Sequence, residues 1–160
     1  MLELRNLIFS DIDKLNTYRM SSEFQKVFPV DINSALYLNE LEECKRAINS
    51  NEHLRYDFVA TLDNIIIGYA IIKKCNGDWE IGFELNPKYW NKSFGYQIAT
   101  MVVEYSFTKL KLKKIMAQCS STNTGSKKIL KNLGMVKVDS IRVNDKLIVN
   151  KYQLINSRVT

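Results

Sequence analysis

The passage from residue 79 to residue 119 restricts the fold of this chain more than any other part of its sequence. Trp79–Leu85 predicts a short strand, and Lys114–Cys119 predicts a second, buried strand. Between them, regularly spaced apolar residues starting at Phe94 form one stripe, which predicts a helix to about residue 110. A strand, a helix and a strand in this order form a crossover, so the two strands should lie parallel in one sheet.

The remaining elements place more strands and helices on either side of this crossover. Upstream, the pattern predicts a strand at 2–8, a helix that Ser10 or Asp11 could cap and that runs to residue 20, and a second helix at 32–48. A hairpin then joins strands 56–62 and 65–73 at Asp63-Asn64, and a turn at 76–78 leads into the crossover. Downstream, a helix ends at Gly134, and two strands follow at 135–140 and 147–154.

The element order β-α-α-β-β-β-α-β-α-β-β predicts an α/β (α+β) fold, with a mixed, mostly antiparallel central sheet flanked by helices. At 160 residues the chain fits one domain over 1–160. No apolar run approaches the roughly 20 residues that cross a bilayer, and the early acidic residues do not fit a signal peptide. We therefore expect a cytoplasmic protein with no membrane partner.

The chain is basic, with 23 Lys and Arg against 17 Asp and Glu and a formal charge of +6. Such a surface attracts anions, whether nucleic acid, a membrane surface or a phosphorylated small molecule. The lysines are scattered, apart from short clusters at 111–114 and 127–131, and the sequence has no helix-turn-helix signature, zinc site or aromatic-basic strand motif. A nucleic-acid-binding domain, the hypothesis that charge alone suggests, is therefore not expected.

The cysteines Cys44, Cys75 and Cys119 are widely spaced and odd in number, and no C-x-x-C pair occurs. This pattern indicates reduced thiols in a reducing compartment. The single histidine, His53, lies in a polar stretch, so a Ser-His-Asp triad or a histidine metal site would depend on this one residue. We expect no metal and no activated cysteine.

The loop between the first crossover strand and its helix is the strongest candidate for chemistry. A helix N-terminus presents unpaired amides and a partial positive charge, which together bind anions. The small residues Ser93 and Gly95 would let the backbone close around a pyrophosphate, and Lys92 adds a positive charge. An ordinary strand–loop–helix joint without a ligand explains these residues equally well.

Residues 86–95, Asn-Pro-Lys-Tyr-Trp-Asn-Lys-Ser-Phe-Gly, and the amphipathic helix after them resemble the acetyl-CoA loop of the GCN5-related N-acetyltransferase (GNAT) family. The resemblance is closest to the branch of ribosomal-protein-alanine acetyltransferases, whose loop usually reads W-G-K-G-Y-A. It continues in the family's order through segments 104–107, 110–115, 123–126 and 131–135, and the opening strand and helix fit as well. Asn91 and Ser93 depart from it, because they stand where the branch usually has glycines.

The resemblance implies that the chain binds acetyl-CoA and transfers its acetyl group to a primary amine of a protein N-terminus or a small molecule. We expect direct attack in a ternary complex, because no cysteine adjoins the loop. The implied cofactor contacts come from the end of the first crossover strand, the loop and the next helix start: Phe83, Leu85, Trp90, Asn91, Lys92, Ser93, Phe94, Gly95, Tyr96, Asn123 and Ser126. Packing is the competing role for Trp90, and helix capping is the competing role for Asn123.

Two carboxylates and one hydroxyl are the candidate catalytic groups. Glu80 and Glu84 have even spacing on one strand, so they should share a face, and either could take the ammonium proton. Glu80 could equally be a solvated strand residue, and Ser126 could donate a proton to the leaving thiolate or cap a helix. Many family members have a tyrosine acid where this chain has Leu130. The group that protonates the leaving thiolate is therefore unassigned. A catalytically weak acyl-CoA-binding sensor or interaction domain is the alternative function.

The acceptor-binding segments that the resemblance implies are residues 24–41 and 139–148. In and beside them lie acidic residues compatible with a cationic amine: Glu23, Asp31, Glu40, Asp139 and Asp145. A protein N-terminus, a polyamine, an amino sugar and an antibiotic all fit this pattern, and so do a monomer and a homodimer.

Overall fold

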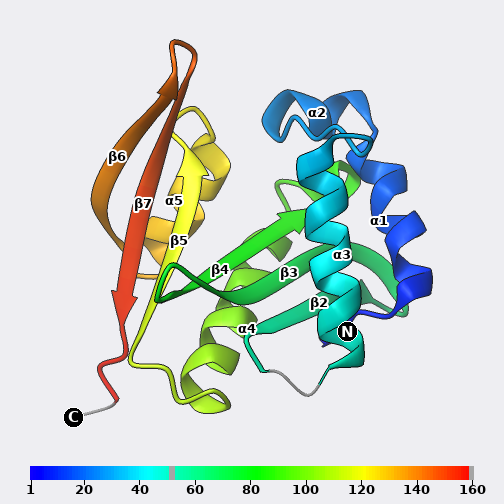
Figure 1. The fold of residues 1–160 in the computed structure, drawn as a ribbon. Helices are drawn as coiled ribbons and strands as arrows, with labels where there is room; N and C mark the ends of the chain where they lie inside the picture. Colours follow the sequence, from blue (N-terminus) through cyan, green and yellow to red (C-terminus); the bar gives the residue numbers. More distant parts are fainter. Residues whose placement is uncertain (51–52, 159–160) are drawn as a thin grey trace.

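The strands form one sheet in the order β1-β2-β3-β4-β5-β7-β6 in the computed structural model, which describes residues 1–50 and 53–158 (Figure 1). Their bounds are β1 Leu2–Asn6, β2 Arg55–Leu62, β3 Ile65–Cys75, β4 Asp78–Leu85, β5 Lys114–Ser120, β6 Val136–Asn144 and β7 Leu147–Ile155. Neighbouring strands are antiparallel, except that β4 and β5 are parallel. The predicted mixed sheet and its parallel crossover are therefore confirmed.

Helices cover both faces of this sheet. Their bounds are α1 Ile12–Arg19, α2 Ser22–Val27, α3 Ala35–Asn49, α4 Phe94–Thr108 and α5 Thr124–Asn132, with short 3-10 turns at Phe9–Asp11 and Pro87–Tyr89. In Figure 1, α1 and α3 lie in front of β2 and β3, whereas α4 passes behind the sheet. α4 and α5 share that rear face, because Ile98 of α4 and Leu130 of α5 belong to one buried cluster.

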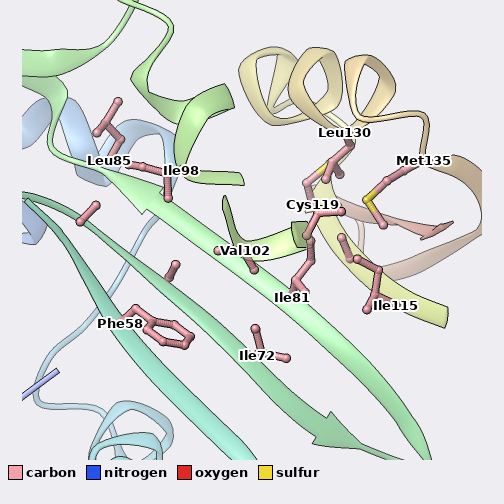
Figure 2. Packing of buried hydrophobic residues seen from close by; sticks show 14 of the residues in the cluster. Phe58, Ile72, Ile81, Leu85, Ile98, Val102, Ile115, Cys119, Leu130 and Met135 are labelled. Carbon is pink, nitrogen blue, oxygen red and sulfur yellow. The ribbon is translucent and has the colours of Figure 1, made fainter. Parts of the chain in front are cut away.

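The larger core lies between the sheet and the helices α4 and α5 (Figure 2). The labelled side chains come from the sheet, from both helices and from the start of the last hairpin: Phe58, Ile72, Ile81, Leu85, Ile98, Val102, Ile115, Cys119, Leu130 and Met135. A second cluster under α1 and α3 includes Leu15, Phe24 and Cys44. The two faces of the sheet therefore have separate cores, and the amphipathic stripe predicted for α4 faces the larger one.

Local turn chemistry explains most of the element boundaries. Asp63 and Asn64 both adopt positive φ at the predicted hairpin, and Gly134, with φ +82°, follows the end of α5 as predicted. The sequence did not predict α2 as a separate helix, although the hydroxyl of Ser21 accepts a hydrogen bond from the Phe24 amide and caps it. α3 begins at Ala35, later than predicted, because the hydroxyl of Ser34 accepts a hydrogen bond from the Tyr37 amide.

The last hairpin is longer than predicted. β6 continues to Asn144, where the sequence indicated an end at residue 140, and its pairing with β7 shifts register twice. Such irregularities let an edge strand continue past a residue that breaks the alternation, so a period-two pattern underestimates its length.

Asp11 joins β1 to the start of α1. Its carboxylate accepts hydrogen bonds from both terminal nitrogens of Arg5, at 2.7 and 2.9 Å, and from the amide of Ile8 at 3.0 Å. The prediction that Asp11 caps the helix through its side chain is wrong, because that side chain makes no cap hydrogen bond and turns back toward the strand. The hydrogen bonds from Arg5 hold the pKa of the Asp11 carboxyl below its usual value.

Replacing this carboxylate should destabilise the fold in a pH-dependent way. We expect Asp11→Asn to lower the free energy of unfolding at pH 7 by about 2 kcal/mol, since a buried Asp11 loses charge-assisted bonds. The pKa is lower in the folded state, so the contribution is present above the unfolded pKa and is lost as pH falls through the folded pKa. Urea denaturation of both proteins at pH 7 and pH 3 measures this. A difference that persists undiminished at pH 3 would contradict it.

Candidate active site

β4 and β5 separate toward their carboxyl ends. They pair only at Glu80 with Met116 and at Ile81 with Ala117, whereas β4 pairs with β3 along its whole length. Figure 1 shows the two strands diverging beyond this point. The apex of the gap therefore lies at residues 80–81 of β4, and the last residues of that strand have no β5 partner.

The register of β4 determines which of its backbone groups face this gap. The Asn86 amide donates to the carbonyl of Ile67, in line with the antiparallel pairing of β3 and β4. Backbone groups alternate in direction along a strand, so even-numbered residues point toward β3 and the odd-numbered Phe83 and Leu85 point toward β5. The Leu85 carbonyl accepts a hydrogen bond from the indole of Trp90 at 2.8 Å. The amides of Phe83 and Leu85 and the carbonyl of Phe83 thus face the gap.

The loop after β4 contains two left-handed residues. Asn91 has φ +60° and Ser93 has φ +62°. These are the two positions at which the sequence departs from the glycines of the resembling loop. Asparagine tolerates the left-handed region, whereas the Cβ of a serine costs roughly 1–2 kcal/mol there. The backbone keeps a conformation that favours glycine although the side chains have changed.

The loop ends at the N-terminus of α4. Ser93 occupies the cap position and makes no side-chain cap hydrogen bond, so the first-turn amides of Phe94, Gly95 and Tyr96 are not capped by it. Lys92 is exposed beside this turn, with its ammonium 3.4 Å from the Lys88 carbonyl. The open helix end and the adjacent cation together suit an anion.

Gly95 has a packing role in addition to its place in the loop. A Cβ built on Gly95 would lie 3.0 Å from Cδ1 of Ile129 on α5. Any larger residue would therefore press on the contact between α4 and α5. A charged substitution here would disturb packing as well as any bound anion, so binding tests need a different position.

Glu84 is held by α1. Its Oε1 atom accepts hydrogen bonds from the Tyr18 hydroxyl and the Arg19 Nε, each at 2.6 Å. The Arg19 guanidinium also donates to the Tyr37 hydroxyl at 3.2 Å, which ties α3 to the same group. Burial lowers the pKa of Arg19, but the Glu84 carboxylate outweighs it and keeps that pKa above its ordinary value. Burial, with the nearby Glu84 charge, raises the pKa of the Tyr18 phenol.

Glu80 lies at the apex, in different surroundings. The register between β3 and β4 is regular from Glu80 to Glu84, so the two carboxylates share the face that α1 and α3 cover in part. Glu80 is half-buried, and its Oε1 accepts a hydrogen bond from the side-chain amide of Gln118 on β5 at 2.9 Å. Of the two candidate bases, Glu84 is engaged by a cation and Glu80 by a neutral amide.

The candidate residues of α5 lie on the opposite face, with α4. The Asn123 side chain accepts a hydrogen bond from the Ser126 amide at 3.0 Å and caps the helix, so the capping interpretation of Asn123 is confirmed. Ser126 is half-buried in the first turn. Leu130, which stands where many members of the resembling family have a tyrosine acid, is 1% exposed and packs in the core.

The sequence did not predict the partners of these groups. Tyr18 and Arg19 lie 66 and 65 residues from Glu84, and Gln118 lies 38 residues from Glu80. A cavity of about 210 Å³ next to Glu84 is lined by residues of α1, α3 and the sheet, including Arg19, Tyr37 and Tyr69. No local pattern marks these residues, because only the folded sheet brings α1 and β4 together.

Within residues 1–50 and 53–158, no group of three or more His, Cys, Asp or Glu side chains could hold a metal ion. Over the same ranges, no helix has the length and apolar character needed to cross a membrane.

Comparison with known proteins gives a consistent picture. A family model described as an acetyltransferase (GNAT) domain matches residues 1–136. The uncharacterized N-acetyltransferase YnaD of Bacillus subtilis (strain 168) is 27% identical over 139 residues, which is 84% of this chain and 78% of that protein. The uncharacterized N-acetyltransferase p20 of Bacillus licheniformis is 27% identical over 152 residues, with 91% and 84% covered.

Solved structures share the fold at lower identity. Spermidine N-acetyltransferase from Vibrio cholerae, in complex with CoA and spermine, has a TM-score of 0.80 and 19% identity, covering 98% of this chain and 96% of that one. Ribosomal-protein-S5-alanine acetyltransferase from Vibrio fischeri also has a TM-score of 0.80 and 19% identity, with 99% and 95% covered. At this identity the likeness concerns the fold.

The left-handed serine generates a stability prediction. We expect Ser93→Gly to raise the free energy of unfolding by about 0.5–1 kcal/mol, because glycine removes the steric cost of φ +62° but gains entropy in the unfolded chain. Ser93→Ala keeps a Cβ and should bring no gain, which makes it the matched control. Chemical denaturation of the three proteins measures the effect, and equal stability of the glycine and alanine variants would contradict it.

Proposed function

The chain belongs to the GNAT acetyltransferase family, and from that premise we propose that it transfers the acetyl group of acetyl-CoA to a primary amine by direct attack in a ternary complex. The observation that carries the proposal is the gap between β4 and β5, which leads from a carboxylate at its apex to the open N-terminus of a helix. Residues 1–160 act in this proposal as one acetyltransferase domain, since strands from both ends of the chain share one sheet.

The backbone of β4 and the start of α4 fit the two ends of acetyl-CoA. The amides of Phe83 and Leu85 and the Phe83 carbonyl can pair with the amide groups of the pantetheine arm, as a neighbouring strand would. The first-turn amides of α4 from residue 94 to residue 96, with Lys92, can bind the pyrophosphate. Bound there, acetyl-CoA supplies an activated thioester. An amide aimed at the carbonyl oxygen would contribute typically ~3 kcal/mol of transition-state stabilisation.

Glu80 is the base in this proposal. An alkylammonium has a reference pKa of about 10.4, so an attacking amine must first lose a proton. Glu80 lies at the apex, and within residues 1–50 and 53–158 its carboxylate is hydrogen-bonded only to the neutral side chain of Gln118. Glu84 is better suited to hold α1 against the open end of β4, because Arg19 and Tyr18 occupy its Oε1 atom.

The leaving thiolate needs less help than the amine. A thiol has a reference pKa of about 8.5, so its anion leaves readily near neutral pH. With Leu130 in the core, Ser126 at the first turn of α5 is the candidate proton donor that remains. Because α5 packs on the face opposite Glu80, the base and this donor flank the gap from two sides.

An acetyl-cysteine intermediate has no support among the described thiols. Burial, together with the Asp57 charge, raises the pKa of Cys44 to about 12. Burial also raises the pKa of Cys119. His53 stacks on Tyr56 rather than pairing with a thiol. A thiolate nucleophile requires the opposite environment, so attack by the amine itself is proposed.

The acceptor is proposed to be a protein N-terminus or a small-molecule amine. Glu40, one of the carboxylates considered for a cationic acceptor, is already paired with Arg55 at 2.9 Å and Lys73 at 2.8 Å. Solved structures that share the fold are named for spermidine and for the alanine of ribosomal protein S5, so both belong in a panel of acceptors. The three free cysteines agree with a cytoplasmic location, which we include in the proposal.

The function itself is tested by thiol release from acetyl-CoA across a panel of amines. Release that depends on an amine supports an N-acetyltransferase. Tight acetyl-CoA binding without release from any amine would instead support the second candidate, a catalytically weak sensor or interaction domain of the same fold. The strained Ser93 is the observation that favours this candidate, since it puts a Cβ at a left-handed position where the resembling loop usually has glycine.

Cofactor binding is tested at Tyr96, which is 40% exposed on the first turn of α4. A glutamate there suits the helix N-terminus but repels a bound pyrophosphate, so Tyr96→Glu should weaken acetyl-CoA binding about tenfold or more while the fold is retained. Thr108→Glu puts the same charge at the other end of the helix and should leave affinity unchanged. Calorimetric titration compares the acetyl-CoA affinity of the parent and the two variants. Equal affinity in the parent and Tyr96→Glu would contradict the proposed phosphate site.

The two carboxylates should respond differently to amidation. We expect Glu80→Gln to lower turnover about 10²-fold with little change in stability, the usual effect of losing a positioned base. Glu84→Gln should lower the free energy of unfolding by about 2 kcal/mol, because it leaves the buried Arg19 without its counterion. Steady-state rates and urea denaturation separate the two effects. Parent-like turnover in Glu80→Gln would exclude this carboxylate as the base.

A further inference from the structure

Gln118 connects the two strands where they separate. It follows Ala117, the last β5 residue paired with β4. Its side chain points to the same face as that of Glu80, because Met116 is the register partner of Glu80 and Gln118 is two residues further along β5. The Nε2 atom of Gln118 lies 2.9 Å from Oε1 of Glu80. This hydrogen bond crosses the gap at its apex.

We propose that Gln118 is a positioning residue that orients the Glu80 carboxylate and favours its charged form for proton abstraction. This inference rests on the proposed function and adds a residue to it. An amide N–H donates to a carboxylate and stabilises the negative charge. The same bond restricts rotation of the Glu80 side chain while leaving Oε2 outside this contact. Gln118 thereby prepares the base without contacting the reacting atoms.

Several charged groups surround Glu80, whereas its own hydrogen-bond partner, Gln118, is neutral. On β3, Lys73 is the register partner of Glu80, and its ammonium is bonded to Glu40 of α3 at 2.8 Å. On β7, Lys151 is opposite Gln118, and Asp139 on β6 is opposite Lys151. Toward the end of β4, Glu84 is neutralised by Arg19 of α1. Gln118 thus stands between Glu80 and Lys151.

A charged residue at position 118 would change the base in a predictable direction. A lysine would form an ion pair with Glu80 and make its carboxylate a weaker base. A glutamate would place a like charge against Glu80 and favour its protonated form. Only a neutral donor orients the carboxylate while leaving its charge free to accept a proton.

The test measures protonation of Glu80 separately from catalysis. Carboxyl carbon NMR of glutamate-labelled protein, free of ligands, gives the midpoint of Glu80 protonation. Relative to the parent, we expect the midpoint to rise by about half a pH unit in Gln118→Leu, to rise by about one unit in Gln118→Glu, and to fall in Gln118→Lys. Gln153→Leu changes the same residue type on the same face of β7, opposite Met116, and should leave the midpoint unchanged.

Rates with an active acceptor provide the second readout. The alkaline-rising limb of kcat should move with the Glu80 midpoint, kcat should fall about tenfold in Gln118→Leu, and the KM for acetyl-CoA should stay the same. Identical Glu80 midpoints in the parent and all three Gln118 variants would overturn the inference, whatever the activity. A second outcome would also overturn the inference: the Gln118 variants shift the Glu80 midpoint but keep the parent rate, although Glu80→Gln is inactive. The proposed function would still stand in that case. Parent-like turnover of Glu80→Gln would exclude Glu80 as the base and would therefore also exclude the proposed role of Gln118.

Discussion

The site depends on a strand that loses its partner. β4 keeps its full pairing with β3, but it leaves β5 after two residue pairs. A strand edge inside a sheet that faces neither another strand nor a covering side chain leaves polar backbone groups to be satisfied by something else. The amides of Phe83 and Leu85 are therefore the backbone donors that the loss of pairing with β5 leaves for another partner.

The free end of β4 is held by contacts from three directions. On the α1 side, Glu84 binds Arg19 and Tyr18. In the plane of the sheet, the indole of Trp90 occupies the Leu85 carbonyl. At the apex, Gln118 reaches Glu80 from the opposite strand. Each contact uses a different residue of β4, so together they hold the strand where pairing with β5 has ended.

The sequence predicted those parts of the structure that local patterns determine. The crossover, the positive-φ hairpin at Asp63-Asn64 and the glycine after α5 follow from periodicity and turn chemistry, and the structure confirms them. The sequence predicts a phosphate site at the loop after β4, because a strand, a small-residue loop and a helix are consecutive there, and this site stays a prediction. The engagement of Glu84 and the partner of Glu80 could not be predicted, since their donors are 65 and 38 residues away. Asp11 failed as a predicted cap because Arg5 is a stronger partner than the amides of the helix.

The close approach of Gly95 to Ile129 has a consequence for how molecules reach the gap. α4 is attached to the β4 half of the sheet and α5 to the β5 half, and their contact bridges the gap on the rear face. On the front face, the hydrogen bond between Gln118 and Glu80 crosses the gap at its apex, and Gln118 is exposed there. The packing of α4 on α5 therefore covers the rear of the gap between β4 and β5. Under the proposed function, an acceptor amine would therefore reach Glu80 from the front face, where Gln118 and its register partner Lys151 lie.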